Sequence, residues 1–179
     1  YLRADFAFPA LDRDPKGRLL NPDLAGGSLL DIGIYPVFLA YLLLGVPREF
    51  RVLAHFHQTG VEKQIALIFD YPEAMAVLYS GLSSHSEMKA EISCRDGSVF
   101  LTPRWHEAES YEVLQEGQSQ VVEHPLKGSG YTYEIEEVHS CLKAGETEST
   151  LWSWKDSIAL HGLLEAIRDR AGIVFPGES

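Results

Sequence analysis

The sequence predicts one α+β domain, in which a mostly antiparallel, open β-sheet carries helices packed on one of its faces. Hydrophobic and polar residues alternate from about residue 50 to residue 123, whereas the segments before and after this region show helical spacing. Within the alternating region, Asp96-Gly97 and Glu116-Gly117 are pairs typical of tight hairpin turns. Consecutive hairpins indicate that neighbouring strands run antiparallel.

The first third of the chain predicts a strand, a long loop and a helix. The strand places four apolar side chains on one side: Leu2, Ala4, Phe6 and Phe8. Turn residues then fill Pro9 to Gly27, and a loop of this length in a compact domain is often functional. A helix follows from Leu29 to Leu44, with Ser28 and Asp31 as a capping box and Gly45 as its end. Because this helix is apolar nearly all round, we expect it to be buried over most of its surface.

The remaining elements are seven strands and two helices. The strands are expected at Arg51 to Gln58, Lys63 to Tyr71, Ala74 to Leu82, Glu87 to Cys94, Ser98 to Thr102, Ser110 to Gln115 and Gln120 to Glu123. One helix spans Tyr133 to Lys143, with apolar residues along one stripe. The other begins at a second capping box, Ser153 with Asp156, and ends at Gly172. On its apolar stripe His161 is expected to be a core histidine.

Composition limits the classes of function. The 179 residues are 45% hydrophobic and 23% charged, with a net charge of −11, which excludes a disordered or fibrous protein. A negative charge of this size disfavours nucleic acid and anionic membranes as partners. The two distant cysteines, Cys94 and Cys141, fit a reducing, cytoplasmic setting. The apolar stretch within Ile34 to Val46 is too short to cross a bilayer, so no membrane span is predicted.

Asp31 and Tyr35 are the residues that most favour chemistry. Four positions apart on a helix, they share a face, and Gly33 between them leaves room for a close approach. In one interpretation Asp31 caps the helix and Tyr35 fills the core. In the other, a carboxylate and a phenol converge on a substrate oxygen.

Three segments resemble a known family of oxidoreductases. Gly26 to Pro36 (Gly-Gly-Ser-Leu-Leu-Asp-Ile-Gly-Ile-Tyr-Pro), continuing to Pro47, resembles the start of the C-terminal domain of the glucose-fructose oxidoreductase, inositol dehydrogenase and rhizopine catabolism (Gfo/Idh/MocA) family. Gly130 to Ser149 and Ile167 to Pro176 resemble its dimeric dihydrodiol dehydrogenase branch. The resemblance implies a sheet domain like the C-terminal domain of glyceraldehyde-3-phosphate dehydrogenase.

The resemblance implies hydride transfer between NAD or NADP and a sugar, polyol, diol or related carbonyl. In this family an N-terminal Rossmann domain binds the dinucleotide and supplies a lysine, and the two further catalytic positions match Asp31 and Tyr35. The chain has neither a GxGxxG fingerprint nor Glu-Lys-Pro, and it starts within a strand. We therefore expect residues 1 to 179 to be a single C-terminal domain without its Rossmann domain, inactive alone and with no cofactor-binding residues of its own.

Further expectations concern the cleft and the partners. Phe6, Gly27 and Gly33 are expected to line a substrate cleft. His55 and His57 could chelate a metal, but no supporting ligand pattern accompanies them, so we expect no metal site. Trp105 and His106, like Trp152 and Trp154, are expected to make core or dimer contacts.

The resemblance also implies a homodimer, or a higher homo-oligomer, formed through the open sheet face. The alternative function is a non-catalytic protein-binding or dimerisation module in which the pair of Asp31 and Tyr35 is structural.

Overall fold

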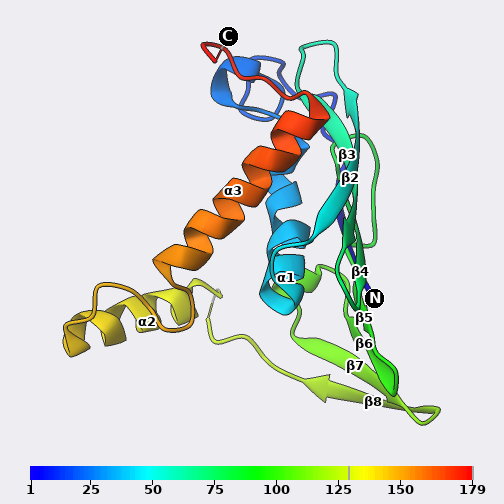
Figure 1. Cartoon of the computed structure of the whole chain (residues 1–179), viewed down its shortest axis with the longest axis vertical. Coiled ribbons are helices and arrows are strands. Elements are labelled where there is room, and N and C mark those ends of the chain that lie inside the picture. Colours follow the sequence, from blue (N-terminus) through cyan, green and yellow to red (C-terminus); the bar gives the residue numbers. More distant parts are fainter. Residues whose placement is uncertain (129, 179) are drawn as a thin grey trace.

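A computed structural model describes residues 1–128 and 130–178 and shows one eight-stranded open sheet (Figure 1). The strand order is β2-β3-β4-β1-β5-β6-β7-β8. The strands are β1 (Leu2–Ala7), β2 (Glu49–Phe56), β3 (Glu62–Asp70), β4 (Met75–Gly81), β5 (Ala90–Ser93), β6 (Gly97–Leu101), β7 (Ser110–Gln115) and β8 (Gln118–Glu123). Each lies within a few residues of its predicted position, and both predicted tight hairpins are present, β5 with β6 and β7 with β8.

The first strand breaks the expected series of consecutive hairpins. β1 lies between β4 and β5, parallel to β4 and antiparallel to β5, so that β4 and β5 are not neighbours. Its Leu2 and Ala4 side chains are almost completely buried, which explains why a strand without a local partner occupies the middle of the sheet. All other neighbouring strands are antiparallel, as predicted.

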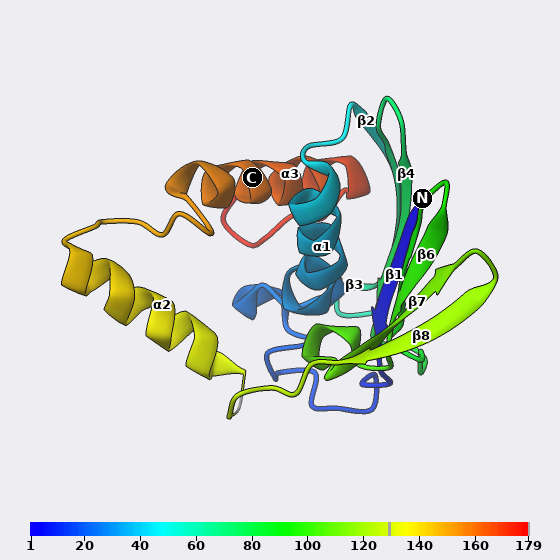
Figure 2. The ribbon, with the colours of Figure 1, turned by 90° about the horizontal axis from the view of Figure 1, so that it is seen from below.

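Helices α1 (Ile34–Leu44) and α3 (Trp154–Ala171) lie along one face of the sheet, whereas α2 (Tyr131–Ala144) stands away from it (Figure 2). None of the α2 side chains is buried, so the predicted arrangement of helices on one face holds for α1 and α3 only. The short 3₁₀-helices η1 (Pro22–Leu24) and η3 (Trp105–Glu107) and the π-helix η2 (Leu29–Gly33) complete the fold, and η2 leads directly into α1.

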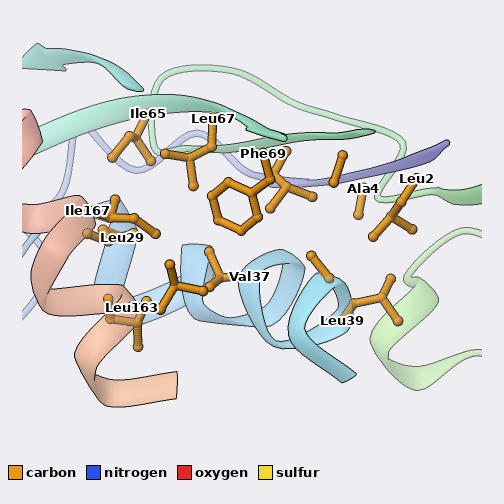
Figure 3. Packing of buried hydrophobic residues seen from close by; sticks show 14 of the residues in the cluster. Leu2, Ala4, Leu29, Val37, Leu39, Ile65, Leu67, Phe69, Leu163 and Ile167 are labelled. Atoms are coloured by element: carbon orange, nitrogen blue, oxygen red, sulfur yellow. The ribbon is translucent and has the colours of Figure 1, made fainter. Parts of the chain in front are cut away.

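The main hydrophobic core fills the space between the sheet and the two helices that cover it. Figure 3 shows the side chains that meet at its centre. They are Leu29 from η2, Val37 from α1, Ile167 from α3, and Leu67 and Phe69 from β3. The Tyr41 hydroxyl donates a hydrogen bond to Asp156 Oδ1 at 2.9 Å, which ties α1 to the start of α3. The predicted capping box at that start is confirmed.

Two burial predictions are wrong. Helix α1 buries only one side, where Val37 and Ala40 face the sheet, while Leu42 is 54% exposed. His161 is exposed, because the buried stripe of α3 runs through Leu160 and Leu164 instead.

The helical stretch Pro22–Leu44 is longer than the apolar run expected from the sequence, with a mean hydropathy of 1.7, which by length and composition would suffice to cross a membrane. Half of its most apolar window is nevertheless buried within the fold. A non-helical turn at Ala25 to Gly27 also interrupts it. These are the properties of a core helix.

The helix start is not held by the predicted capping box. Ser28 is fully buried and its hydroxyl accepts a hydrogen bond from Ser80 on β4, at 3.2 Å. The cap comes from another strand: the carboxylate of Glu62, at the start of β3, accepts hydrogen bonds from the backbone amides of Leu29, at 2.6 Å, and of Ser28. A carboxylate is well suited to this position, because the first amides of a helix have no partner within it.

The capping carboxylate is almost completely buried. Glu62 is 1% exposed, and this burial raises its pKa to about 7, although the hydrogen bonds from Leu29 and Ser28 act in the opposite direction. Between the ordinary pKa and this raised value, the folded chain retains a proton that the unfolded chain has lost. The contribution of Glu62 to stability is therefore full at low pH and falls as the pH rises toward about 7.

We predict that Glu62→Gln removes this pH dependence, because the amide keeps an oxygen for Leu29 but cannot ionise. The free energy of unfolding of the variant, relative to the wild type, should rise between pH 5 and pH 8 by up to about 3 kcal/mol. Denaturant unfolding at both pH values measures the difference. The exposed Glu73→Gln serves as a matched control. A difference that stays constant with pH would contradict this assignment.

Candidate functional site

Asp31 and Tyr35, predicted as a pair from their spacing, line one open pocket of about 570 Å³. Asp31 lies in η2 and Tyr35 in the first turn of α1. The remaining lining residues are His106 and four apolar side chains, Leu30, Ile34, Phe38 and Trp105. The pocket therefore combines an apolar wall with a small number of convergent polar groups, the usual composition of a small-molecule site.

Asp31 forms an ion pair with Arg18, which comes from the long loop before the helix. The carboxylate side chain is only 16% exposed, whereas the arginine side chain is 69% exposed. Arg18 thus holds the Asp31 carboxylate from the side that faces the solvent. The predicted role of Asp31 in a local capping box is wrong, since its partner is 13 residues earlier in the chain.

Tyr35 is 42% exposed and does not fill the core, as the structural interpretation of this residue required. Its ring meets Phe6 edge-on, with the centroids 5.4 Å apart, and His106 in the same manner at 5.3 Å. Among the described residues no hydrogen bond involves its hydroxyl group. A phenol fixed by two aromatic neighbours, with its hydroxyl group available, is positioned to donate a proton.

His106 is a site residue that the sequence analysis assigned only to core or dimer contacts. Its ring stacks on Phe6, with 4.3 Å between centroids, and its side chain is 8% exposed. Burial lowers the pKa of His106, although nearby Glu107 acts in the opposite direction, so the ring is neutral at neutral pH. Nothing in its spacing links it to Tyr35, which lies 71 residues earlier, so no sequence signal could have found it.

The neighbouring Trp105 fixes this histidine in place. Trp105 is buried, and its indole Nε1 donates a hydrogen bond to the backbone oxygen of Asp5 at 2.9 Å. Its backbone amide donates to Met88 at 3.0 Å. Arg104, in a left-handed conformation with φ of 59°, turns the chain into η3. The core contact expected for Trp105 is therefore present, and it places the next residue at the pocket.

A second hollow, of about 360 Å³, adjoins the first on the other side of Tyr35 and His106. It is more polar and lies against the start of α2, where Tyr131, Tyr133 and Glu134 line it. Neither hollow has a lysine or arginine among its lining residues in the described part of the chain. The phosphates of a dinucleotide would thus find no cationic partner in these two hollows.

The three residues expected to line a substrate cleft have other positions. Gly27 adopts φ of 122°, and a side chain there would overlap the carboxylate of Glu62. At Gly33 a Cβ atom would lie 2.7 Å from the Ser80 hydroxyl oxygen. Both glycines therefore allow the helix start to approach the sheet, and the structure gives them this packing role in place of a cleft position. Phe6 lies behind Tyr35 and His106 as their support.

The other candidates do not form a site in the described residues. The expected shared face of His55 and His57 is wrong, because a register shift follows His55 and His57 lies beyond the end of β2. His57 Nδ1 lies 3.0 Å from the hydroxyl oxygen of Thr59, with which it shares a hydrogen bond. No group of three or more potential metal ligands occurs among the residues that the structure describes. Trp152 packs against Phe38 and Tyr41, a core contact as expected.

Comparison with known proteins identifies the same fold in oxidoreductases. The chain is 30% identical over 166 residues to scyllo-inositol 2-dehydrogenase (NADP(+)) of Bacillus subtilis, which covers 90% of this chain and 50% of that protein. It is 31% identical over 173 residues to human trans-1,2-dihydrobenzene-1,2-diol dehydrogenase, covering 89% and 50%. An aldose-aldose oxidoreductase from Caulobacter crescentus, solved with glycerol, superposes with a TM-score of 0.81 at 24% identity, covering 96% and 52%.

A 3-ketoreductase from Actinomadura kijaniata, solved with NADP, gives a TM-score of 0.79 at 20% identity, covering 94% of this chain and 52% of that one. The chain thus spans about half the length of the relatives that it matches. Residues 1–100 match the family described as the GFO/IDH/MocA C-terminal domain. The resemblance noted in the sequence is confirmed, and the chain belongs to the GFO/IDH/MocA C-terminal domain family.

Proposed function

We propose that this chain is the proton-donating, substrate-binding part of an NAD(P)-dependent oxidoreductase acting on a sugar, polyol, diol or related carbonyl compound. The observation that carries the proposal is the convergence of Asp31 and Tyr35 in one apolar-walled pocket. The names of the relatives support the substrate class. NADP is specified for scyllo-inositol 2-dehydrogenase and also for the D-xylose 1-dehydrogenase of Hypocrea jecorina, to which this chain is 26% identical over 184 residues. Free Cys94 and Cys141 fit the cytoplasm as its location.

The chemistry follows from the position of the phenol. When bound by the preceding domain, a reduced nicotinamide would supply the hydride for the carbonyl carbon. As the carbonyl oxygen gains negative charge, Tyr35 donates its hydroxyl proton to that oxygen, and the product is an alcohol. The neutral His106 ring and the apolar side chains supply a wall of low polarity beside the phenol, which strengthens electrostatic interactions with the developing charge once a substrate fills the pocket. In the reverse direction the tyrosinate takes the proton back.

We also propose that residues 1 to 179 are a single C-terminal domain, preceded in the natural polypeptide by a Rossmann domain that binds the dinucleotide. The relatives' extra length supports this proposal, as does the lack of a GxGxxG fingerprint in this sequence. The cationic residue that would assist Tyr35 would then also come from the preceding domain.

In the longer polypeptide, Tyr35→Phe should lower kcat by about 100-fold or more with little change in thermal stability, because only the proton donor is lost. Turnover of scyllo-inositol and D-xylose with NADP+ is the assay. Tyr111→Phe, on β7, is the matched control. Unchanged turnover in the Tyr35 variant would favour a structural pair and a non-catalytic domain.

The isolated 179-residue chain should bind neither NADPH nor NADH tightly, because neither hollow offers a phosphate site among the described residues. Isothermal titration calorimetry with both cofactors tests this, with the longer polypeptide as the positive control. Stoichiometric micromolar binding by the isolated chain would refute the proposal that the preceding domain binds the dinucleotide.

The open sheet face supports a homodimer as part of the proposal. On the face opposite the helices, Ile68 pairs with Val77, and these side chains are 44% and 37% exposed. Leu53 on the neighbouring strand β2, which is 65% exposed, extends the apolar surface. An exposed apolar sheet surface of this kind is a candidate for burial against a second copy.

We predict that the chain sediments at twice its mass of 20.0 kDa and that Leu53→Glu combined with Ile68→Glu converts it to a monomer. Burying two carboxylates in an apolar interface would cost more than the contacts provide. Leu151→Glu, at a 76% exposed position away from the sheet, is the control and should remain dimeric. A wild-type chain that stays monomeric at high concentration would exclude this interface.

A further inference from the structure

The long loop, Pro9 to Gly27, has a small hydrophobic core of its own. Leu19 and Leu20 from the loop are buried together with Ile32 from the helix start and with Val61 and Leu82, which adjoin the ends of β3 and β4. The burial of these residues offsets the conformational entropy that the loop loses on becoming ordered, so the loop has a fixed shape. The segment that follows Arg18 is thus anchored, although the Arg18 side chain itself is exposed.

Gly26 explains how the loop reaches the helix. A Cβ atom at this position would lie 2.8 Å from the backbone oxygens of both Arg18 and Leu19 and 2.9 Å from that of Asn21. The Gly26 amide donates to Asn21 at 3.0 Å, and the Gly27 amide donates to Leu19 at 2.9 Å. Only glycine permits this close approach, which brings Arg18 beside the first turn of the helix.

The result of this packing is the contact between Arg18 and Asp31. Stability alone gives little reason for such a contact, since exposed ion pairs contribute about 1 kcal/mol or less. Asp31, in contrast, is mostly buried beside the apolar wall of the pocket. Among the described residues, Arg18 is the only cation that pairs with it.

We propose that Arg18 is a positioning residue for the site: it holds the Asp31 carboxylate in one orientation beside Tyr35. The proposal rests on the proposed function for its effect on turnover, but the orientation itself does not depend on it. The guanidinium donates a hydrogen bond to one oxygen of Asp31, and the carboxylate keeps further acceptor capacity for a substrate hydroxyl group. The division of roles then leaves Tyr35 as the proton donor and Asp31 as a fixed acceptor for a substrate hydroxyl group.

The first test measures orientation in this chain without any activity. In the Arg18→Ala variant, the ¹³C signal of the Asp31 carboxyl carbon and the amide signals of Asp31 to Tyr35 should shift. Free guanidinium, added below denaturing concentrations, should restore them toward their wild-type positions. Arg13→Met is the control, because Arg13 lies in the same loop over the ring of Phe8, at 5.3 Å, and should leave these signals unchanged. Unchanged signals in Arg18→Ala, or shifts that guanidinium does not reverse, would overturn the proposal.

The second test uses the longer polypeptide with scyllo-inositol, D-xylose and NADP+. Arg18→Met should lower kcat by about 10- to 100-fold, as misplacement of a catalytic group does. Arg18→Lys should recover part of the loss, and guanidinium should rescue Arg18→Ala but not Tyr35→Phe. If the wild type shows no turnover while the NMR response to Arg18 persists, the proposed function fails and the positioning role stands. Full turnover in Arg18→Met would show that the positioning of Asp31 by Arg18 does not contribute to the reaction.

Discussion

The close packing of the helix start, at Ser28 and Leu29, against strands β3 and β4 is the constraint on which the rest of the structure depends. Glu62 reaches from β3 to the amides of Ser28 and Leu29, and Ser80 reaches from β4 to the Ser28 hydroxyl oxygen. Backbone and sheet can approach this closely only because positions 27 and 33 carry no side chain. A buried carboxylate is costly unless hydrogen-bonded, and here its partners are the orphan amides of the helix.

This packing of the helix start determines where the chemistry can occur. It fixes Asp31 in η2 and Tyr35 one turn later, both near the end of β1 that supplies Phe6. His106, from a different part of the chain, completes the aromatic cluster around Tyr35, because Trp105 is anchored to the backbone of β1. Three separate parts of the chain, namely β1, η2 with α1, and η3, thus hold two polar side chains within an apolar pocket. Such a preorganised site needs little rearrangement when charge develops on a bound substrate.

The sequence predicted what is local and missed what is not. The hairpins at Gly97 and Gly117 and the capping box at Ser153 were correct because each depends on neighbouring residues. The pairing of Asp31 with Tyr35 in one pocket also followed from helical spacing. By contrast, the insertion of β1 beside β4, the cap from Glu62 and the contribution of His106 depend on contacts 33 or more residues apart. No periodicity encodes such contacts, and Ser28 was assigned a capping role that Glu62 performs.

Helix α2 shows that this fold has a surface that requires cover. Its apolar stripe, Ile135, Val138 and Leu142, is 51% to 69% exposed, and the helix buries none of its side chains. An isolated helix of 14 residues is marginal in water, so its stability depends on a surface that packs against this stripe. The start of the same helix lines the polar hollow beside Tyr35. If the proposed Rossmann domain packs against α2, it would cover the stripe and close the hollow, so that substrate enclosure and helix stability would depend on the same contact.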